Sequence, residues 1–326
     1  MSDVQQQHRG SPVAGGMRAR SPGESTAGGQ YEVVVKHHSA APLDWRIQLA
    51  GSVLHRWLFY PAVLGADLLG EVGEVRPGPT RFRAGDRVLG RAVGMERDHN
   101  NPAEGAYHDY TVVQVNMAAA IPAGTRDQNA AALPLARSTA ACALFEKDGL
   151  ALEYPSVNPR PTGQTVLVWG GSTSVGSNAI QLAVAAGYEV ITTCSPKNFG
   201  YVRRLGARKV FDDRSNGVAG QIITALTGRT LAGVLAIGEG SHGPCAEILR
   251  SCEGSKTLVF TTAPGSSVDD PIRRRPTALG LAGAFPGMGV STAALMRRRR
   301  RLGIALEPQL SGVSAEKPLV SLEQVR

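Results

Sequence analysis

The stretch Thr165-Val-Leu-Val-Trp-Gly-Gly-Ser-Thr-Ser-Val-Gly-Ser-Asn-Ala-Ile-Gln-Leu-Ala-Val-Ala-Ala-Gly187 decides how the rest of the chain is interpreted. Its apolar run from Val166 to Trp169 is typical of a strand that is buried on both faces. Gly170 and Gly171 permit a sharp turn, and the apolar residues that follow are spaced three and four apart, as on one face of a helix. The stretch therefore predicts a strand, a tight turn and a helix.

The glycine turn is also a candidate anion site. The first N–H groups of a helix have no partner within the helix and lie at the positive end of its dipole, so they favour a phosphate. A purely steric reason for the glycines explains them equally well when they are taken alone. The cofactor-binding residues predicted in this turn are Gly171, Ser172, Thr173, Ser174, Val175 and Gly176.

The chain beyond the turn favours a dinucleotide as the ligand. Val190–Cys194 is predicted to be a second strand, Phe199–Leu205 a short helix that ends at Gly206, and Lys209–Asp212 a third strand. This alternation of strands and helices is one half of a doubly wound parallel sheet. We therefore expect the turn to hold the pyrophosphate of a dinucleotide.

The end of the second predicted strand bears on which dinucleotide binds. Sites for NAD usually place an Asp or Glu about 20 residues after the glycine turn, where it holds the ribose hydroxyls. Residues 193–198 contain no carboxylate, and Ser195 and Lys197 are able to hold a 2′-phosphate, so NADPH is favoured. Alternatively, Ser195 only caps the next helix and Lys197 is solvated. Tyr201 either packs beside the adenosine end of the cofactor or is an ordinary surface residue.

Length and composition describe a globular protein of about two domains. Of 326 residues, 42% are apolar and 19% charged. Neither a membrane-spanning run nor a secretory segment is present, so we expect a cytoplasmic protein without a membrane partner.

The net charge is +8, but the arginine runs 273–275 and 297–301 account for all of it, so nucleic-acid binding is not expected. The four scattered cysteines are predicted to be small buried residues.

The residues before the glycine turn predict a tail, a small β domain and a helical bridge. Residues 1–29 are rich in Gly, Ser, Gln and Pro and are expected to be a disordered tail. Short strands rich in glycine, with turns between them, then predict a strongly bent β structure. The predicted strands are 31–36, 61–75 with breaks at glycines 65, 70 and 73, 88–93 and 105–113. A turn leads into a short helical piece at 41–46, and one or two helices follow at 130–146, interrupted by Pro134.

After the third predicted strand, strands and helices continue to alternate as far as Ala263. Helices are predicted at 219–227 and 245–252, and strands at 234–237 and 257–262. After Ala263, Pro, Gly and Arg dominate, and regular structure is expected again only in a closing strand at 311–322.

In this order, the motifs resemble the medium-chain dehydrogenase/reductase superfamily, and most closely its zinc-independent branch of quinone reductases and fungal stand-alone enoyl reductases that act with polyketide synthases. The resemblance covers about residues 30–263 and 311–322, and its motifs besides the glycine turn are Pro42–Arg46, Leu64–Asp67, Gly85–Val88, Gly105–Tyr110, Ala131–Pro134, Thr139–Ala140, Ser195–Phe199 and Leu205–Ala207.

The resemblance implies an α/β fold that combines a GroES-like bent β domain with a Rossmann-type doubly wound sheet, incomplete at both ends. The domains it implies are the tail at 1–29, the GroES-like substrate domain at 30–150 with its closing strand from 311–322, the NADP-binding domain at 151–265, and an irregular segment at 266–310.

The resemblance also implies the chemistry. Zinc-dependent relatives bind their catalytic metal through Cys and His, whereas this chain has Asp67 at the matching His position and no Cys before residue 142, so a metal-free reaction is expected. Hydride would pass from NADPH to the activated C=C bond of an enoyl thioester, with solvent supplying the proton. Thr139 would lie near the nicotinamide carboxamide or the pyrophosphate, while Asp44 and Trp45 would shape the domain.

Four departures and several open alternatives accompany the resemblance. The chain has Ala41-Pro42 where relatives have Asn-Pro, the tail where relatives begin with another strand or hairpin, and no acidic residue in the fourth strand at 234–237. Residues 264–310 do not supply the last sheet strands and the helix that returns the chain to the first domain. We hypothesise that both ends of the reading frame are mis-spliced or degenerate. Quinone reduction is an alternative activity, and a non-catalytic nucleotide-binding remnant is an alternative of another class. A polyketide synthase is the expected partner, and a monomer and a dimer both remain open.

Overall fold

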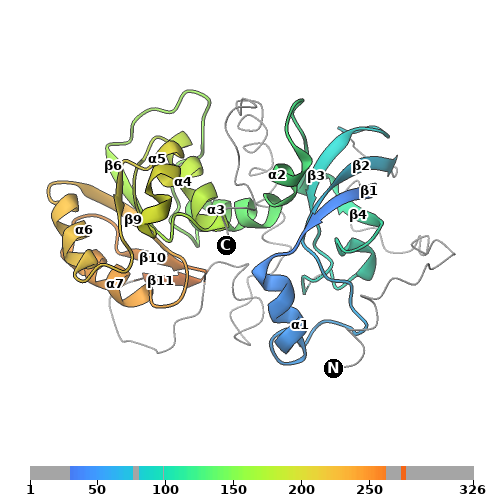
Figure 1. Ribbon diagram of the computed structural model, residues 1–326, viewed down its shortest axis with the longest axis horizontal. Helices are drawn as coiled ribbons and strands as arrows, with labels where there is room; N and C mark the ends of the chain where they lie inside the picture. Colours follow the sequence, from blue (N-terminus) through green and yellow to red (C-terminus); the bar gives the residue numbers. More distant parts are fainter. Residues whose placement is uncertain (1–29, 76–80, 98, 262–272, 277–326) are drawn as a thin grey trace. The chain divides into compact units, whose positions relative to one another are not determined.

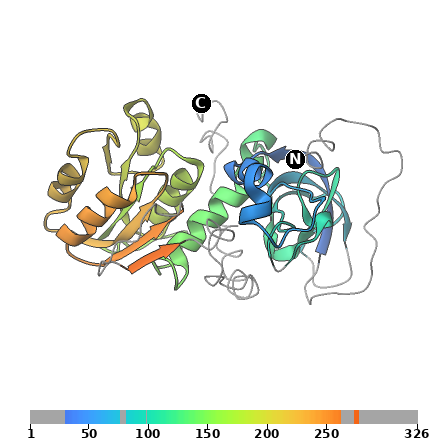
Figure 2. The same ribbon diagram turned by 90° about the horizontal axis from the view of Figure 1, so that it is seen from below.

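The computed structural model describes residues 30–75, 81–97, 99–261 and 273–276, which divide into two units (Figures 1 and 2). The first unit includes the described residues up to Leu135 and the second begins at Ala136. The division therefore falls at residue 135, whereas the sequence suggested a boundary after residue 150. The predicted tail at 1–29, the irregular segment at 277–310, the closing strand at 311–322 and the hypothesis about the two chain ends lie outside the described residues.

An antiparallel five-stranded sheet in the order β4-β1-β2-β3-β5 forms the first unit. The register between β1 and β2 shifts twice, which is how a sheet bends through bulges. Successive residues Leu68 and Leu69 point to opposite faces and enter separate apolar clusters, so both faces are covered. The bent β structure is thus confirmed, with β1 at Gln30–Ser39, β2 at Asp67–Val75, β3 at Arg87–Arg91, β4 at Tyr110–Gln114 and β5 at Ala118–Ala120.

Two of its strands are shorter than the sequence suggested. A strand was predicted from Pro61 with a break at Gly65, and β2 begins only after that break, at Asp67, because the positive φ of 97° at Gly65 interrupts extended structure. A side chain at Gly65 would lie 2.7 Å from the ring of Tyr107. Similarly, β4 starts at Tyr110, because Pro102–Glu104 forms a 3₁₀ turn and the residues after it continue as a loop.

Helix α1 (Pro42–Leu54) is longer than the short helical piece expected at 41–46. Pro42 suits the first helical position, and the carboxylate of Asp44 accepts a hydrogen bond from Ala41 N at 2.7 Å, which satisfies a backbone donor before the helix. Ile47 faces the core, whereas Trp45 is 54% exposed. Asp44 therefore has the expected structural role, but the exposed Trp45 packs into no core.

The helical bridge consists of two helices, α2 (Asp127–Ala131) and α3 (Pro134–Phe145). Pro134 begins the second of them, which suits a residue without a backbone N–H. Ala130 and Ala131 pack against Leu69, Leu89 and Ile121 of the first unit. The sequence predicted one or two helices interrupted at Pro134, and the structure has two.

The second unit contains a six-stranded parallel sheet in the order β11-β10-β9-β6-β7-β8. This is the doubly wound order, in which the strand order reverses between β6 and β9. In Figure 1, α4 and α5 lie on one side of this sheet and α6 and α7 on the other. The elements are β6 Gln164–Trp169, α4 Ser174–Ala185, β7 Glu189–Thr193, α5 Phe199–Arg204, β8 Lys209–Phe211, α6 Val218–Leu226, β9 Thr230–Ala236, α7 His242–Ser251, β10 Thr257–Phe260 and β11 Arg273–Pro276.

Strand β11 corrects the expectation that no regular structure follows Ala263 before residue 311. It pairs in parallel with β10, from Thr257↔Arg273 to Phe260↔Pro276. The four cysteines are free and buried, as predicted. No helix in the described part of the chain combines the length and apolar character that crossing a lipid bilayer requires.

Candidate cofactor site

The glycine turn connects β6 to α4 and is fixed to the neighbouring strand β7. Gly170 has a positive φ of 83°, its N–H donates to Thr193 Oγ1 at 3.1 Å, and Gly171 N donates to Thr193 O at 2.8 Å. A Cβ at Gly171 would lie 2.0 Å from Thr192 Oγ1, so this position has no room for a side chain. The turn follows the carboxyl end of β6, beside the point of strand reversal, where doubly wound sheets bind ligands.

Thr173 caps the start of α4. Its Oγ1 accepts a hydrogen bond from Gly176 N at 3.0 Å and donates one to Gly170 O at 2.8 Å, which joins the helix start to the turn. The first helical hydrogen bond runs from Ser177 N to Thr173 O, so the amides of Ser174 and Val175 precede it. Two amides at a capped helix start can receive an anion.

Gly176 has a steric reason as well. A Cβ there would lie 2.2 Å from Gly170 O and 2.8 Å from Gly171 Cα, because α4 starts directly against the turn. Both Gly171 and Gly176 are therefore needed by the protein's own packing, whether or not a ligand binds. The close approach keeps the cradle of backbone amides free of side chains, so these residues fit the pyrophosphate of a dinucleotide.

Tyr201 and Ser177 join the next helix to the turn. The Tyr201 hydroxyl donates to Ser177 Oγ at 3.0 Å, and Ser177 Oγ donates to Gly171 O at 3.2 Å. Ser177 is fully buried, and burial raises the pKa of Tyr201 more than the Ser177 hydrogen bond lowers it. Tyr201 is thus half-buried and braces α5 against α4, which neither sequence interpretation had described.

Ser195 and Lys197 follow β7, where the sequence suggested the 2′-phosphate. Ser195 occupies the cap position of the 3₁₀ turn Pro196–Asn198, but its side chain makes no capping hydrogen bond. Lys197 is exposed on the same turn. The hydroxyl of Ser195 therefore does not cap this turn, and the interpretation of Ser195 as a cap only is not supported.

Three charged residues that the sequence did not identify as site residues, Arg203, Asp212 and Asp213, lie near the turn that follows β7. Burial raises the pKa of the Cys194 thiol to about 11, assisted by Asp213 and Asp212 and opposed by Arg203, so all three charges lie close to the end of β7. Cys194 N donates to Phe211 O at 3.0 Å, which brings the residues after β8 beside those after β7. The two carboxylates approach this turn through the pairing of β8 with β7, so no local sequence pattern identified them.

A second glycine-rich turn follows β9, the strand next to β6. Ile237 N donates to Trp169 O at 3.2 Å, and its carbonyl lies 3.0 Å from the position of a Cβ at Gly170. Gly238 has a positive φ of 94°, and its carbonyl accepts the hydroxyl of the fully buried Ser241 at 2.6 Å. This turn and the β6 turn are adjacent at the strand reversal, and no site residue had been predicted in it.

Thr139 lies on α3, away from these turns in the sequence, and is buried. The residues that the described contacts bring together are Gly171, Thr173, Gly176 and Tyr201, with Ser195 and Lys197 connected to them through β7. Among the residues that the structure describes, no group of three or more His, Cys, Asp or Glu side chains is arranged to hold a metal ion.

Comparisons with known proteins agree with this architecture. The model of the alcohol dehydrogenase GroES-like domain matches residues 28–123. The dehydrogenase pigH of Monascus ruber is 52% identical over 235 residues, which are 71% of this chain and 64% of that protein, so the chain spans less than two thirds of this relative. The trans-enoyl reductase himH of Aspergillus japonicus is 36% identical over 260 residues, 79% of this chain and 72% of that protein.

A solved structure is similar across both units. The crystal structure of an alcohol dehydrogenase superfamily protein from Novosphingobium aromaticivorans has a TM-score of 0.64 and 26% sequence identity, and the match covers 89% of this chain and 80% of that chain.

Proposed function

We propose that this chain, which belongs to the medium-chain dehydrogenase/reductase superfamily and to its fungal enoyl reductase branch, reduces the C=C bond of an α,β-unsaturated thioester with NADPH and without a metal ion. The observation that carries the proposal is the cradle at the strand reversal, where the capped start of α4 lies against a turn that has no space for side chains. The similarity to the trans-enoyl reductase himH of Aspergillus japonicus supports the enoyl substrate.

The residues after β7 support NADPH in preference to NADH. The Ser195 hydroxyl is not used in capping, and Lys197 and Arg203 add positive charge to this region. Asp212 and Asp213 oppose them, and Asp213 Oδ1 is buried with no hydrogen-bond partner among the described residues, so it is able to accept a ribose hydroxyl. We propose the phosphate because a hydroxyl and two cations are the groups that bind it.

The chain's own residues would bind and orient the reactants. Ser174 and Val175 amides would hold the pyrophosphate, and Thr139 would orient the nicotinamide end from α3. When bound, NADPH supplies the hydride for the β-carbon of the enoyl group, and the α-carbon takes a proton from solvent. A carrier domain of a polyketide synthase would deliver the thioester.

Two measurements on the purified chain test the proposal. NADPH fluorescence should change on binding, and an acyl-carrier-bound enoyl thioester should be reduced with one NADPH oxidised for each double bond. The same assay is run with a panel of quinones. If NADPH is oxidised with quinones but not with enoyl thioesters, the activity is quinone reduction. Binding of NADPH without turnover on either panel would instead identify a nucleotide-binding remnant, and no binding would refute the proposal.

A further inference from the structure

Asp67 connects the sheet of the first unit to the start of α3. It is the first residue of β2, is 3% exposed, and its Oδ1 accepts a hydrogen bond from Leu135 N at 2.6 Å. Leu135 is the second residue of α3, and the two residues are 68 positions apart in the sequence. The carboxylate thus caps a helix that lies far from it along the chain.

This long-range cap replaces a local one. Helix starts are usually capped by the oxygen of the residue just before them, but here that residue is Leu133, and Pro134 has no N–H to satisfy. The N–H of Leu135 is consequently the first donor of the helix, and an ionised carboxylate is also favoured by the positive end of the helix dipole. Asp67 therefore fixes where α3 begins.

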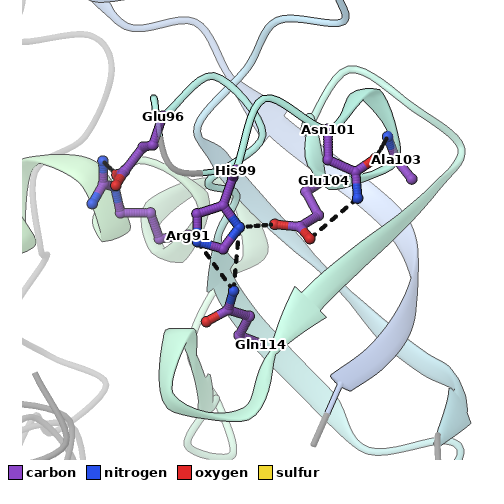
Figure 3. A network of polar contacts seen from close by, with 7 residues as sticks. All are labelled: Arg91, Glu96, His99, Asn101, Ala103, Glu104 and Gln114. Carbon is purple, nitrogen blue, oxygen red and sulfur yellow. Dashed lines mark hydrogen bonds and ion pairs between the residues drawn. The ribbon is translucent and has the colours of Figure 1, made fainter. Parts of the chain in front are cut away.

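Charged and polar side chains surround Asp67. Arg91 on β3 is its cross-strand partner, is itself buried and forms an ion pair with Glu96 at 2.5 Å (Figure 3). Asp44 on α1 raises the pKa of Asp67, and Tyr107, which donates to Asp44 at 3.0 Å, belongs to the same group of interacting residues. Burial raises the pKa of Asp67 to about 7, against the lowering by Leu135 N and Arg91.

Helix α3 leads from this anchor to Thr139. The helix starts in the first unit at Pro134, and Thr139 lies four residues beyond Leu135, one helical turn further along. Because backbone hydrogen bonds make a helix stiff over one turn, the anchor at Leu135 sets the position of the Thr139 backbone.

We infer that Asp67 is a positioning residue for the proposed reduction, whose carboxylate holds the first turn of α3 and thereby the placement of Thr139. The inference rests on the proposed function for its effect on turnover, but the anchor itself is a property of the folded chain. The ionised form makes the stronger bond, so the position of Thr139 becomes responsive to pH.

Two substitutions distinguish the effect of the hydrogen-bond acceptor at Asp67 from the effect of its negative charge. Asp67→Asn keeps an oxygen acceptor for Leu135 N but does not titrate, and Asp67→Ala removes the acceptor. Asp67→Ala should lower kcat about 10- to 100-fold with NADPH affinity nearly unchanged. We expect kcat of the wild type to rise between pH 6 and 8, and Asp67→Asn should keep most activity and lose this rise. Asp109→Asn, on an exposed loop of the same unit, is the matched control and should retain the wild-type profile.

Hydrogen exchange of the backbone amides provides a test without turnover. In Asp67→Ala the amides of Leu135 to Thr139 should exchange about tenfold faster, while those of α4 should not change. Unchanged exchange in α3 would overturn the inference, even in an active enzyme. An inactive wild type whose α3 amides respond as expected would instead contradict the proposed function and leave the anchor standing. If Asp67→Ala does not fold, the wild type provides the test: its Leu135 amide should be protected from exchange, because it donates to Asp67 although it precedes the first hydrogen bond within the helix. An unprotected Leu135 amide would overturn the inference.

Discussion

Tyr201 donates a hydrogen bond from its hydroxyl to Ser177 Oγ at 3.0 Å, although the two residues lie on different helices. Ser177 in turn donates to the carbonyl of Gly171. This chain of hydroxyl groups connects α5 and α4 to the turn that is proposed to hold the pyrophosphate. A change in Tyr201 should consequently act on the turn through Ser177.

Replacing Tyr201 by Phe should weaken this brace. The substitution leaves the buried Ser177 hydroxyl without its donor, so we expect a loss of about 1 kcal/mol in the free energy of unfolding, with a smaller effect on NADPH affinity. Urea denaturation and NADPH titration measure the two effects. Tyr154→Phe is the control, because that ring is 46% exposed on the surface. A large loss of NADPH affinity at unchanged stability would mean that Tyr201 contacts the cofactor directly.

Gly176→Ala should damage the cradle itself. The new Cβ would overlap Gly170 O, which is backbone and cannot rotate away, so α4 must shift. We expect a destabilisation of about 1–3 kcal/mol and a loss of NADPH binding, measured by thermal unfolding and fluorescence.

Gly220→Ala is the matched substitution for this test. Gly220 is an exposed residue of α6 in the same unit, and a Cβ there would meet no atom within 4 Å. The change should stabilise the protein by about 0.4–1 kcal/mol and leave NADPH binding intact. Equal tolerance of Ala at both glycines would contradict the packing described for the turn.

The second unit was largely predictable because each of its central strands is a continuous apolar run that ends at a glycine. Val166–Trp169 and Val234–Ile237 are such runs, and parallel strands buried on both faces require them. Strand β11 was not predictable, because three arginines and a proline carry no strand pattern, and only pairing with β10 makes Arg273–Pro276 extended. The start of β2 at Asp67 follows the positive φ of Gly65, and the sequence marked Gly65 as a break but did not show that the residues before it are not extended.

The candidate site was predictable where it depends on neighbours in the sequence. The glycines, the capping residue Thr173 and the two residues Ser195 and Lys197 all follow predicted strands directly. By contrast, Asp213 approaches the end of β7 only because β8 pairs beside it, and Asp67 reaches Leu135 only through the folding of the whole first unit. No local pattern encodes such distant contacts.

Lys197→Glu should separate the two nicotinamide cofactors. If the lysine binds the 2′-phosphate, charge reversal should raise the Kd for NADPH about tenfold, or by about 1.4 kcal/mol, and change the Kd for NADH little. Lys209→Glu, at the opposite end of β8, introduces the same charge change away from the cofactor edge and should affect neither. Equal losses for NADPH and NADH in the Lys197 variant would contradict the phosphate role.

Asp213→Asn tests whether the residues near the end of β7 bind NAD instead of NADPH. Its unpartnered oxygen suits a ribose hydroxyl, and its charge repels a phosphate. Under the NADPH proposal the substitution should strengthen NADPH binding by a few-fold, since it removes one negative charge from beside the proposed phosphate position. A selective loss of NADH binding, with NADPH binding weak throughout, would show that the site is built for NAD.

Asp67 should also make the stability of the first unit depend on pH. Its pKa is raised from 3.8 to about 7, chiefly by burial, so the folded chain holds this proton over a range in which the unfolded chain has released it. The contribution of Asp67 to the free energy of unfolding therefore falls as the pH rises from about 4 to about 7 and is constant above that, with a total on the order of 2–4 kcal/mol. Asp67→Asn should remove this slope, and the difference between variant and wild type should grow from pH 5 to pH 8. Hydrogen exchange of β2 and β3 at several pH values measures it, and parallel curves for the two proteins would show that Asp67 is ionised in the folded state throughout.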